Sequence, residues 1–299
     1  MTTRSPNTFV IGAGPVATAL ATALRLGGVP VLGIWARRPA PARAAAAAAG
    51  VAAYSSAPPD LLLESDIVVL AVRDDAVAQI ATMLVGTGMI TRKHVLLHCS
   101  GATAAAEAFA DVIDKVGGIG TLHPLRAIAD GKAVGRAMKG TMFGIEGDER
   151  GRAAAAALAH AMGGVALSLD GGQMASYHAA AAMASNYVVA LIDAAAQVLA
   201  GAGLPPDQAV AALVPLAQGA LTNIAEQGIA GALTGPIRRG DQATVARHLG
   251  ALDGEVAEIY RVLARRALEI AARLDGPTAP PRDRLAAIAT LLSRASGEA

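Results

Sequence analysis

This sequence has little of what disulfides, metal centres and broad charged surfaces require. Its 299 residues include one cysteine, Cys99, which excludes an intrachain disulfide and favours a reducing compartment, the cytoplasm. The six histidines and this cysteine show no metal-ligand spacing of the H-E-x-x-H or C-x-x-C kind, so we predict no bound metal. The net charge of +1 indicates neither a nucleic-acid partner nor an anionic membrane surface.

Long uninterrupted hydrophobic runs are also missing, although 54% of the residues are hydrophobic. The longest apolar tract, residues 179–204, is rich in alanine and contains Asn186 and Asp193. A membrane-spanning helix needs about 20 consecutive apolar residues, so we expect a buried helix here and no membrane span. The length and composition are those of a chain with a sizeable core, divided into two domains.

What the sequence does have is a glycine-rich turn at the end of an apolar strand. Residues 9–17 join this strand to a G-x-G-x-x-A turn that opens a helix, and a second apolar run follows at residues 29–35. The first glycine permits the tight turn, the second lets a pyrophosphate approach the backbone, and the alanine keeps helix and strand close. The helix N-terminus adds free N–H groups and a positive dipole. We therefore predict a dinucleotide cradle formed by Gly12, Gly14, Pro15, Val16 and Ala17.

The residues after the second apolar run indicate which dinucleotide the cradle holds. NAD-selective sites carry an Asp or Glu about 20 residues beyond the glycines, where this chain has Trp35, Ala36, Arg37 and Arg38. A guanidinium group pairs through its planar fork with a dianionic phosphate. We therefore predict that Arg37 and Arg38 bind the 2′-phosphate of NADP. A solvated arginine pair in a turn is the alternative.

Strands and helices alternate through the first half of the chain. Apolar runs predict further strands at residues 50–54, 66–72, 95–99, 118–122, 141–146 and 165–169, and helices at 16–26, 40–49 and 150–162. This alternation predicts an α/β fold with a doubly wound Rossmann-type sheet, which presents ligands at the carboxyl ends of its strands. Ala71, Val72, Arg73 and Cys99 lie at two such ends, and we expect them to border the cofactor. Cys99 is expected to fill space there and not to act as a nucleophile.

From residue 171 onward, helix follows helix. The pattern predicts helices at residues 174–200, 205–227, 241–274 and 282–296. We therefore predict a Rossmann domain at residues 1–170 and an all-helical domain at residues 171–299. Small-residue faces at 179–182 and 194–196 allow another helix to approach closely, so we expect a homodimer built on this second domain.

Five segments stand in order along nearly the whole chain: HCSGA at 98–102, GTLHPL at 120–125, IEGD at 145–148, YH at 177–178 with ASNY at 184–187, and LTGPI with RGD at 233–241. Together they resemble the signature of a family of uncharacterised proteins that pair a Rossmann-like domain with a DUF2520 domain. More distantly, the chain is similar to pyrroline-5-carboxylate reductases and 6-phosphogluconate dehydrogenases. This resemblance implies an N-terminal dinucleotide domain and a C-terminal helical domain that forms dimers, but it implies no particular substrate.

Reduction of a C=O or C=N bond by NADPH requires a proton donor at the nicotinamide end of the site. In β-hydroxyacid dehydrogenases, which share this architecture, a helical lysine stands four residues before an asparagine. The asparagine that resembles it is Asn186, and Ala182 occupies the lysine position. His123 and His178 are candidate replacements because an imidazole has a near-neutral pKa. The segment around His123 is similar to one in prephenate dehydrogenases, where a histidine beside a strand-end serine acts on the substrate oxygen, and this resemblance implies Ser100 as its helper.

Three further residues are candidates for contact with a substrate. At about 100° per residue, His178 and Ser185 lie on one face of a helix, and Asn186 borders the same cleft. Arg238 has the geometry to bind a carboxylate. Each candidate has a structural alternative: His123 satisfying a backbone carbonyl, His178 as a buried imidazole, and Arg238 in an interdomain ion pair.

The other polar residues have structural expectations. We expect His98 to face the core and Asp241 to cap the helix that follows it. The three remaining histidines are expected to be solvated: His94, His160 and His248.

The sequence therefore predicts an NADP-dependent oxidoreductase that reduces the C=O or C=N bond of a small carboxylate-bearing substrate, a 2-oxo acid or a cyclic imino acid. The expected catalytic residues are His123, Ser100 and His178. The alternative is a noncatalytic NADP-binding or sensing protein, in which the missing lysine reflects loss of the chemistry.

Overall fold

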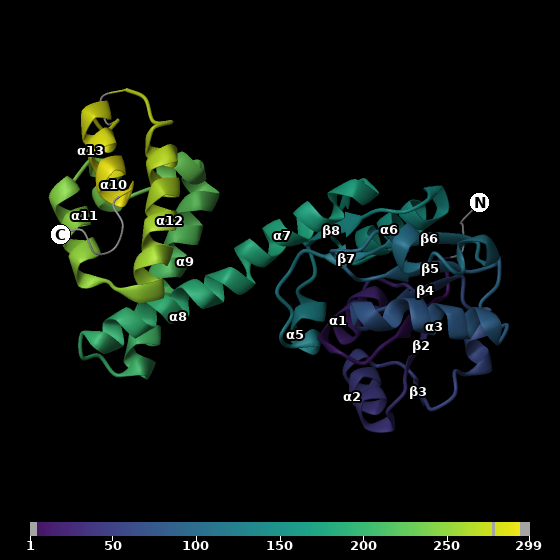
Figure 1. Cartoon of the computed structure of the whole chain (residues 1–299). Coiled ribbons are helices and arrows are strands. Elements are labelled where there is room, and N and C mark those ends of the chain that lie inside the picture. Colours follow the sequence, from purple (N-terminus) through teal and green to yellow (C-terminus); the bar gives the residue numbers. More distant parts are fainter. Residues whose placement is uncertain (1–4, 277–278, 294–299) are drawn as a thin grey trace. The chain divides into compact units, whose positions relative to one another are not determined.

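The protein folds into two compact units that meet in the sequence at Ser185 and Asn186 (Figure 1). The computed structural model describes residues 5–276 and 279–293. The first unit is α/β and the second is all-helical, which confirms the predicted fold class. The division falls later than the predicted boundary at residues 170 and 171, because the helix α7 (Met174–Ala184) belongs to the first unit.

The α/β unit is built on six parallel strands in the order β3-β2-β1-β4-β5-β6. The order begins at β1 in the middle and moves outward on both sides, as in a doubly wound sheet. The turn after β1 therefore lies where the strand order reverses, which is where such sheets bind ligands. The strands are β1 (Thr8–Ile11), β2 (Val31–Ala36), β3 (Ala53–Ser55), β4 (Ile67–Leu70), β5 (Val95–His98) and β6 (Gly118–Thr121).

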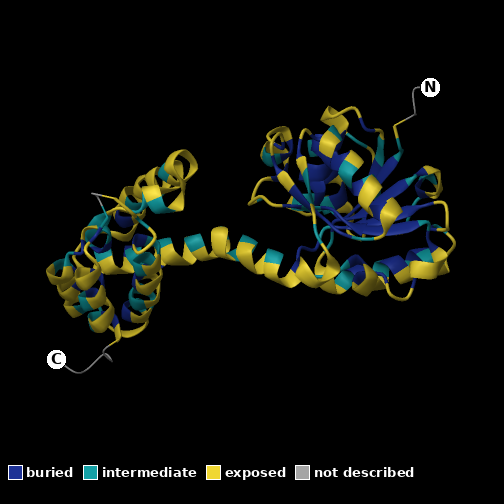
Figure 2. Ribbon diagram, turned by 90° about the horizontal axis from the view of Figure 1, so that it is seen from above, coloured by how far each residue is buried: buried dark blue, intermediate teal, exposed yellow. Residues whose placement is uncertain are grey.

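Each face of this sheet is covered by its own helices. Successive strand residues point to opposite faces, so Val10 and Leu97 pack with α1, α2 and α6, whereas Ile11 and Leu96 pack with α3 and α4. Figure 2 shows the resulting buried sheet beneath helices with exposed outer faces. The helices are α1 (Pro15–Leu26), α2 (Pro39–Ala49), α3 (Asp74–Gly86), α4 (Ala105–Ala108), α5 (Gly131–Arg136) and α6 (Glu149–Ala161), with short 3₁₀ helices η1 (Asp60–Glu64), η2 (Ile113–Lys115) and η3 (Gly171–Gln173).

The last two predicted strands do not extend the main sheet. They form β8 (Met142–Ile145) and β9 (Val165–Ser168), which pair in parallel with each other, and β8 also pairs antiparallel with β7 (His123–Pro124) in a separate three-stranded sheet. A single bridge between Gly120 and Gly147 links β6 to this segment. The edge of β6 is then closed, because the Asp148 carboxylate accepts a hydrogen bond from the Ile119 N–H at 2.9 Å while it caps α6. The expectation that the alternating strands form one sheet as far as residue 169 is wrong, because the Asp148 carboxylate occupies the edge of β6 at which a further strand would pair.

In the helical unit, the predicted long helices are interrupted. The helix predicted over 174–200 breaks at Ser185 (φ −126°, ψ −74°), and the one predicted over 241–274 divides where Leu252 and Asp253 are extended. Gly228 has a φ of 71°, which kinks α9 next to the predicted end at residue 227. Residues 294–296 of the last predicted helix lie outside the described residues. The helices are α8 (Asn186–Gly201), α9 (Pro206–Ala232), α10 (Gly235–Arg239), α11 (Gln242–Ala251), α12 (Gly254–Ala271) and α13 (Arg282–Ser293).

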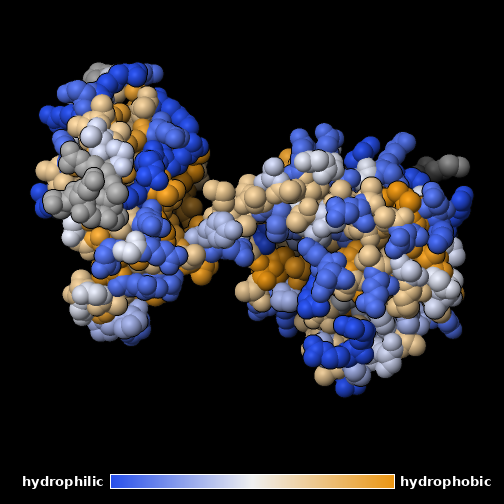
Figure 3. Space-filling model, viewed as in Figure 1, coloured by the Kyte–Doolittle hydropathy of each residue, from blue (hydrophilic) through white to orange (hydrophobic). Residues whose placement is uncertain are grey.

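The core of this unit is small, and much of its apolar surface is exposed. The buried cluster includes Val245 and Ile288, whereas α9 has one buried residue, Ala209, and exposes Leu216 by 71%. Figure 3 shows hydrophobic side chains interrupting the hydrophilic surface of the unit. Two stretches, Gly171–Gly201 and Pro206–Arg239, are long and apolar enough to cross a membrane by length and composition, which is weak evidence for a span.

Three of the structural expectations have clear outcomes. Asp241 caps α11, because its carboxylate accepts a hydrogen bond from the Thr244 N–H at 3.0 Å, as predicted. The expectation that His94 is solvated is wrong, because only 1% of this residue is exposed. Its Nδ1 accepts a hydrogen bond from the Thr91 N–H at 3.0 Å, so the turn between Thr91 and His94 folds the ring inward. His98 is fully buried, as predicted.

Candidate functional site

The turn after β1 has the geometry of a phosphate cradle. Gly12 has a φ of 123°, and a Cβ atom there would lie 2.1 Å from the Ala71 carbonyl oxygen, so only glycine fits. Gly14 precedes α1, and a Cβ atom there would meet nothing within 4 Å. No acidic residue stands in the first turn of α1 to compete for its N–H groups. The structure thus leaves open space in front of a helix N-terminus, which is suited to an anion.

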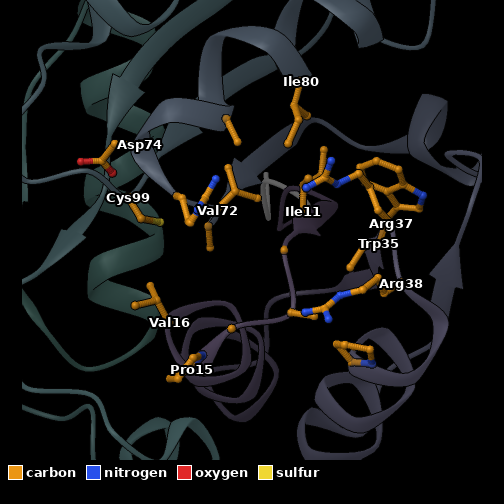
Figure 4. Close-up of a pocket in the computed structure, with 18 residues that line it drawn as sticks. Ile11, Pro15, Val16, Trp35, Arg37, Arg38, Val72, Asp74, Ile80 and Cys99 are labelled. Carbon is orange, nitrogen blue, oxygen red and sulfur yellow. The ribbon is translucent and has the colours of Figure 1, made fainter.

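A cavity of about 1020 Å³ extends from this turn along the carboxyl ends of the strands. Figure 4 shows its two ends, with Arg37 and Arg38 at one and Asp74 and Cys99 at the other. Ala17 does not line the cavity, because it is buried in the core beneath the turn. The other predicted cofactor-binding residues all line it: Gly12, Gly14, Pro15, Val16, Arg37, Arg38, Ala71, Val72, Arg73 and Cys99.

The arginine end of the cavity carries unbalanced positive charge. Arg37 and Arg38 follow β2 and are exposed, and neither forms an ion pair within the described ranges 5–276 and 279–293. Arg73, by contrast, pairs with Asp75 at 2.8 Å. Arg37 and Arg38 are therefore available to an anionic group in the cavity, and the 2′-phosphate of NADP is such a group.

The opposite end of the cavity contains a carboxylate that the sequence analysis missed. Asp74 is the first residue of α3, and its carboxylate accepts a hydrogen bond from the Ser100 hydroxyl at 2.9 Å. Ser100 was expected to assist His123, but its hydroxyl bonds to Asp74, lies 3.4 Å from the Thr103 hydroxyl and accepts from the Ala102 N–H, and none of these partners is His123. The sequence contained a signal for it, because Asp74 lies two residues beyond the predicted end of a strand at residue 72. Burial, together with the smaller effect of the negative charge of Asp74, raises the pKa of the Cys99 thiol to about 12, which supports the space-filling role of this cysteine.

Behind Ser100 lies a buried chain of hydrogen bonds. The Ser100 N–H donates to His98 Nδ1 at 3.2 Å, and His98 Nε2 lies 3.2 Å from the Thr121 hydroxyl. Glu146, also buried, accepts from the Ala105 N–H at 2.7 Å and from Thr121 at 3.4 Å. Burial lowers the pKa of His98 to about 4, so this imidazole is neutral at pH 7 and fixes the loop that carries Ser100.

His123 and His178, the two candidate proton donors, lie together in the first unit. Their ring centroids are 5.8 Å apart and their planes are nearly perpendicular. A Cβ atom on Gly101 would lie 2.7 Å from His178 Nδ1 and 2.9 Å from His123 Nε2. The absence of a side chain at Gly101 therefore lets the two imidazoles converge over the loop that follows β5.

Tyr177 is a second residue that the sequence analysis missed, although it precedes His178 in the YH segment. Its hydroxyl lies 2.8 Å from His123 Nδ1, and the two rings make an edge-to-face contact. When the hydroxyl donates this bond, His123 carries its hydrogen on Nε2, which faces Gly101 and His178. Burial raises the pKa of Tyr177, so its hydroxyl keeps its proton at neutral pH.

The protonation state of His123 differs from the expectation. Burial, followed by the nearby His178, lowers the pKa of His123 to about 4, and Asp74 opposes this shift. The premise of a near-neutral imidazole is therefore wrong for His123 in the protein alone, because desolvation disfavours the charged form. The ring is a hydrogen-bond donor at pH 7 and becomes a cation only when a further negative charge approaches it.

The structure does not join the remaining substrate candidates to this group through one helix. Ser185 ends α7, and its hydroxyl donates to the Ala181 carbonyl at 2.9 Å. Asn186 begins the second unit, so the helical relation that was expected between it and His178 is interrupted. Arg238 lies in the second unit, where it lines a cavity of about 530 Å³ with Arg239.

Comparison with known families gives two matches along the chain. Residues 8–111 match the family described as "NADP oxidoreductase coenzyme F420-dependent", and residues 141–267 match the domain of unknown function DUF2520. Together, in this order, the matches confirm the resemblance to proteins that pair a Rossmann-like domain with DUF2520. No curated protein matches the sequence significantly.

Similar solved structures support the same fold. A protein of Bacteroides fragilis, named as a proposed NADP oxidoreductase, and a protein of Thermotoga maritima each align with a TM-score of 0.69 and 23% identity, covering 89% of this chain and 98% of theirs. A pyrroline-5-carboxylate reductase of Coxiella burnetii aligns with a TM-score of 0.58 and 16% identity, covering 89% of this chain and 99% of that one. At these identities the likeness concerns the fold.

Proposed function

This chain belongs to the family that joins an NADP-oxidoreductase domain to a DUF2520 domain, and we propose that it is an NADPH-dependent reductase. Its substrate is a small molecule that carries a carboxylate beside a C=O or C=N bond, either a 2-oxo acid or a cyclic imino acid. The similarity to a pyrroline-5-carboxylate reductase supports the second of these classes. We also propose that the protein is cytoplasmic.

One observation carries the proposal: the cavity has a glycine turn with open space before a helix N-terminus in its middle, and at one end two arginines without an ion pair among the described residues. In this assignment, the free N–H group of Val16 at the start of α1 binds the pyrophosphate, and Arg37 and Arg38 bind the 2′-phosphate. The bound NADPH supplies the hydride. The protein then has to position the acceptor carbon and deliver a proton to the oxygen or nitrogen of the substrate.

His123 is the group we assign to that proton. Its low pKa keeps it neutral until an anionic substrate binds, and a nearby carboxylate favours the charged form of an imidazole. Binding of a carboxylate-bearing substrate would therefore raise the pKa of His123, so that the imidazole takes up a proton from solvent and becomes the general acid beside the substrate. Tyr177 holds Nδ1, so that Nε2 is the atom presented to the substrate. The ring centroid of His178 lies 5.8 Å from that of His123, so His178 borders the same part of the site. The Ser100 N–H donates to His98 and thereby orients the loop that leads to Gly101.

A second candidate function rests on a specific residue. Ala182 stands where β-hydroxyacid dehydrogenases carry their catalytic lysine, and a protein that lost this chemistry while keeping its cavity would be a noncatalytic NADP-binding or sensing protein. The two functions differ in one respect that can be measured, because a sensor binds NADPH without oxidising it in the presence of any acceptor.

The test begins with 2-oxo acids and cyclic imines, screened by NADPH oxidation. On an accepted substrate, His123→Ala should lower turnover about 10² to 10⁴ fold, the usual range for general acid catalysis, and leave the dissociation constant of NADPH nearly unchanged. Ser100→Ala should lower turnover less, since it removes an orienting hydrogen bond. If His123→Ala keeps full turnover while His178→Ala abolishes it, His178 is the acid. If binding of NADPH is tight and no acceptor is reduced, the sensing function is favoured.

We also propose that the helical unit forms a homodimer. Much of α9 is apolar, and apolar helix surface is normally buried, yet Ala209 is the single buried residue of this helix. The same unit contains an apolar cavity of about 560 Å³, lined in part by Leu191, Val198 and Leu263. A second copy of this chain supplies an apolar helix and a matching groove together, as a self-complementary interface requires.

A further inference from the structure

Asp74 occupies a distinctive position in the cofactor cavity. It begins α3 and lines the end of the cavity opposite Arg37 and Arg38, beside Cys99 (Figure 4). Nothing in the dinucleotide-binding turn requires a carboxylate there. Its place in the cavity therefore calls for a role of its own.

The strand order indicates which half of a dinucleotide reaches Asp74. The turn after β1 lies at the centre of the sheet, with β2 and its following arginines on one side and β4 and β5 on the other. A dinucleotide that places its pyrophosphate at this turn and its 2′-phosphate at Arg37 and Arg38 extends its nicotinamide half toward the ends of β4 and β5. This step rests on the proposed NADP-binding function.

The carboxylate of Asp74 is both held in place and electrically uncompensated. The buried Ser100 hydroxyl donates to it at 2.9 Å, and the Ser100 backbone is itself held by His98. The adjacent Arg73 is paired with Asp75, and Asp74 has no ion pair in the described part of the chain. Its negative charge reaches the surroundings, since it acts on the pKa values of His98, His123 and Cys99.

We propose that Asp74 distinguishes the oxidation states of the cofactor and binds the oxidised form preferentially. Loss of a hydride, which carries two electrons to the acceptor carbon, leaves one positive charge on the nicotinamide ring, while the substrate oxygen or nitrogen takes up a proton. The reduced ring has no charge. A fixed carboxylate at this end of the cavity therefore stabilises the cofactor after hydride transfer and favours the direction of substrate reduction.

The test compares Asp74→Asn with the matched control Asp75→Asn in the full-length protein. Asparagine removes the charge of Asp74 but can still accept the hydrogen bond from Ser100. Asp75 is its neighbour and is likewise exposed, but it pairs with Arg73 and does not line the cavity. The dissociation constants of NADP⁺ and NADPH are measured for each protein by calorimetry, without any substrate.

In Asp74→Asn, the ratio of the NADP⁺ constant to the NADPH constant should rise by about two- to fivefold, as for one charge contact at an exposed carboxylate. The ratio should stay unchanged in Asp75→Asn and in Asp74→Glu, which keeps the charge and covers the case in which Asp74→Asn folds poorly. The inference would be overturned, and the proposed function would stand, if Asp74→Asn weakened the binding of both cofactors equally. The same conclusion would follow if Asp74→Glu raised the ratio of the two dissociation constants as much as Asp74→Asn does. Failure of the unaltered protein to bind either cofactor would overturn both.

Discussion

Replacement of Gly101 by alanine tests whether the convergence of His123 and His178 matters for activity. The added Cβ atom would lie 2.9 Å from His123 Nε2 and 2.7 Å from His178 Nδ1, which is 0.5 and 0.7 Å inside the 3.4 Å at which ordinary contact begins. Both rings must therefore move, and His123 would also strain its hydrogen bond to Tyr177. Overpacking of this kind costs about 1 to 3 kcal/mol of folding stability.

The effect of Gly101→Ala on turnover should be larger than its effect on folding. A displacement of about 1 Å in a positioned catalytic group can cost roughly 10² in rate, so we expect a loss of this order in kcat on the substrate found by the screen. The dissociation constant of NADPH should change little, because Gly101 does not line the cofactor cavity. Gly86→Ala is the matched control, since a Cβ atom there meets nothing within 4 Å. Full turnover in a folded Gly101→Ala protein would refute the assignment of the imidazole pair to the chemistry.

Four further outcomes are expected. Arg37→Ala combined with Arg38→Ala should weaken NADPH at least about tenfold and NADH little, because each contact to a phosphate contributes roughly 1.5 to 3 kcal/mol; equal losses in calorimetry would contradict the clamp. Because burial lowers the folded pKa of His98 to about 4, its contribution to stability is complete above pH 6.5 and is lost as the pH falls toward 4, by at most about 3 kcal/mol. Urea unfolding between pH 7 and pH 4 should therefore be less pH-dependent in His98→Asn, and an unchanged dependence would exclude His98 as the cause. If an anionic substrate protonates His123, the KM of that substrate should rise as the pH increases from about 4, the pKa of His123 in the protein alone, to the higher pKa of the complex, and should level off above it. A KM independent of pH over this range in the unaltered protein, or one that still rises in His123→Ala, would contradict this coupling. Sedimentation should give twice the 29.8 kDa chain mass. The exposed residue Leu216 is tested by Leu216→Lys, which should favour the monomer, and the control Leu26→Lys in the first unit should leave the dimer intact. Recovery of the protein with membranes would contradict the dimer.

Local patterns were sufficient to predict much of the first unit. The G-x-G-x-x-A turn, the apolar runs and the missing acid after residue 35 all depend on residues close together in the chain, whose backbone preferences and periodicity are local properties. The parallel sheet and the cradle followed from them. The helix interruptions at Ser185 and at Leu252 escaped prediction because no proline or glycine occupies either position, and only the packing of each segment decides where such a helix stops.

The candidate site, like the fold, was predicted in part from local sequence patterns. The sequence alone determined that Ser100 and His123 follow neighbouring strands and that Arg37 and Arg38 stand where an acid would select NAD. It also determined that the position four residues before Asn186 is not a lysine. Only the tertiary structure decided that Ser100 bonds to Asp74, that Tyr177 holds His123, and that burial lowers the pKa of this imidazole. Hydrogen-bond partners and desolvation depend on groups far apart in the chain, such as residues 123 and 177, which become neighbours only when the sheet and α7 pack together.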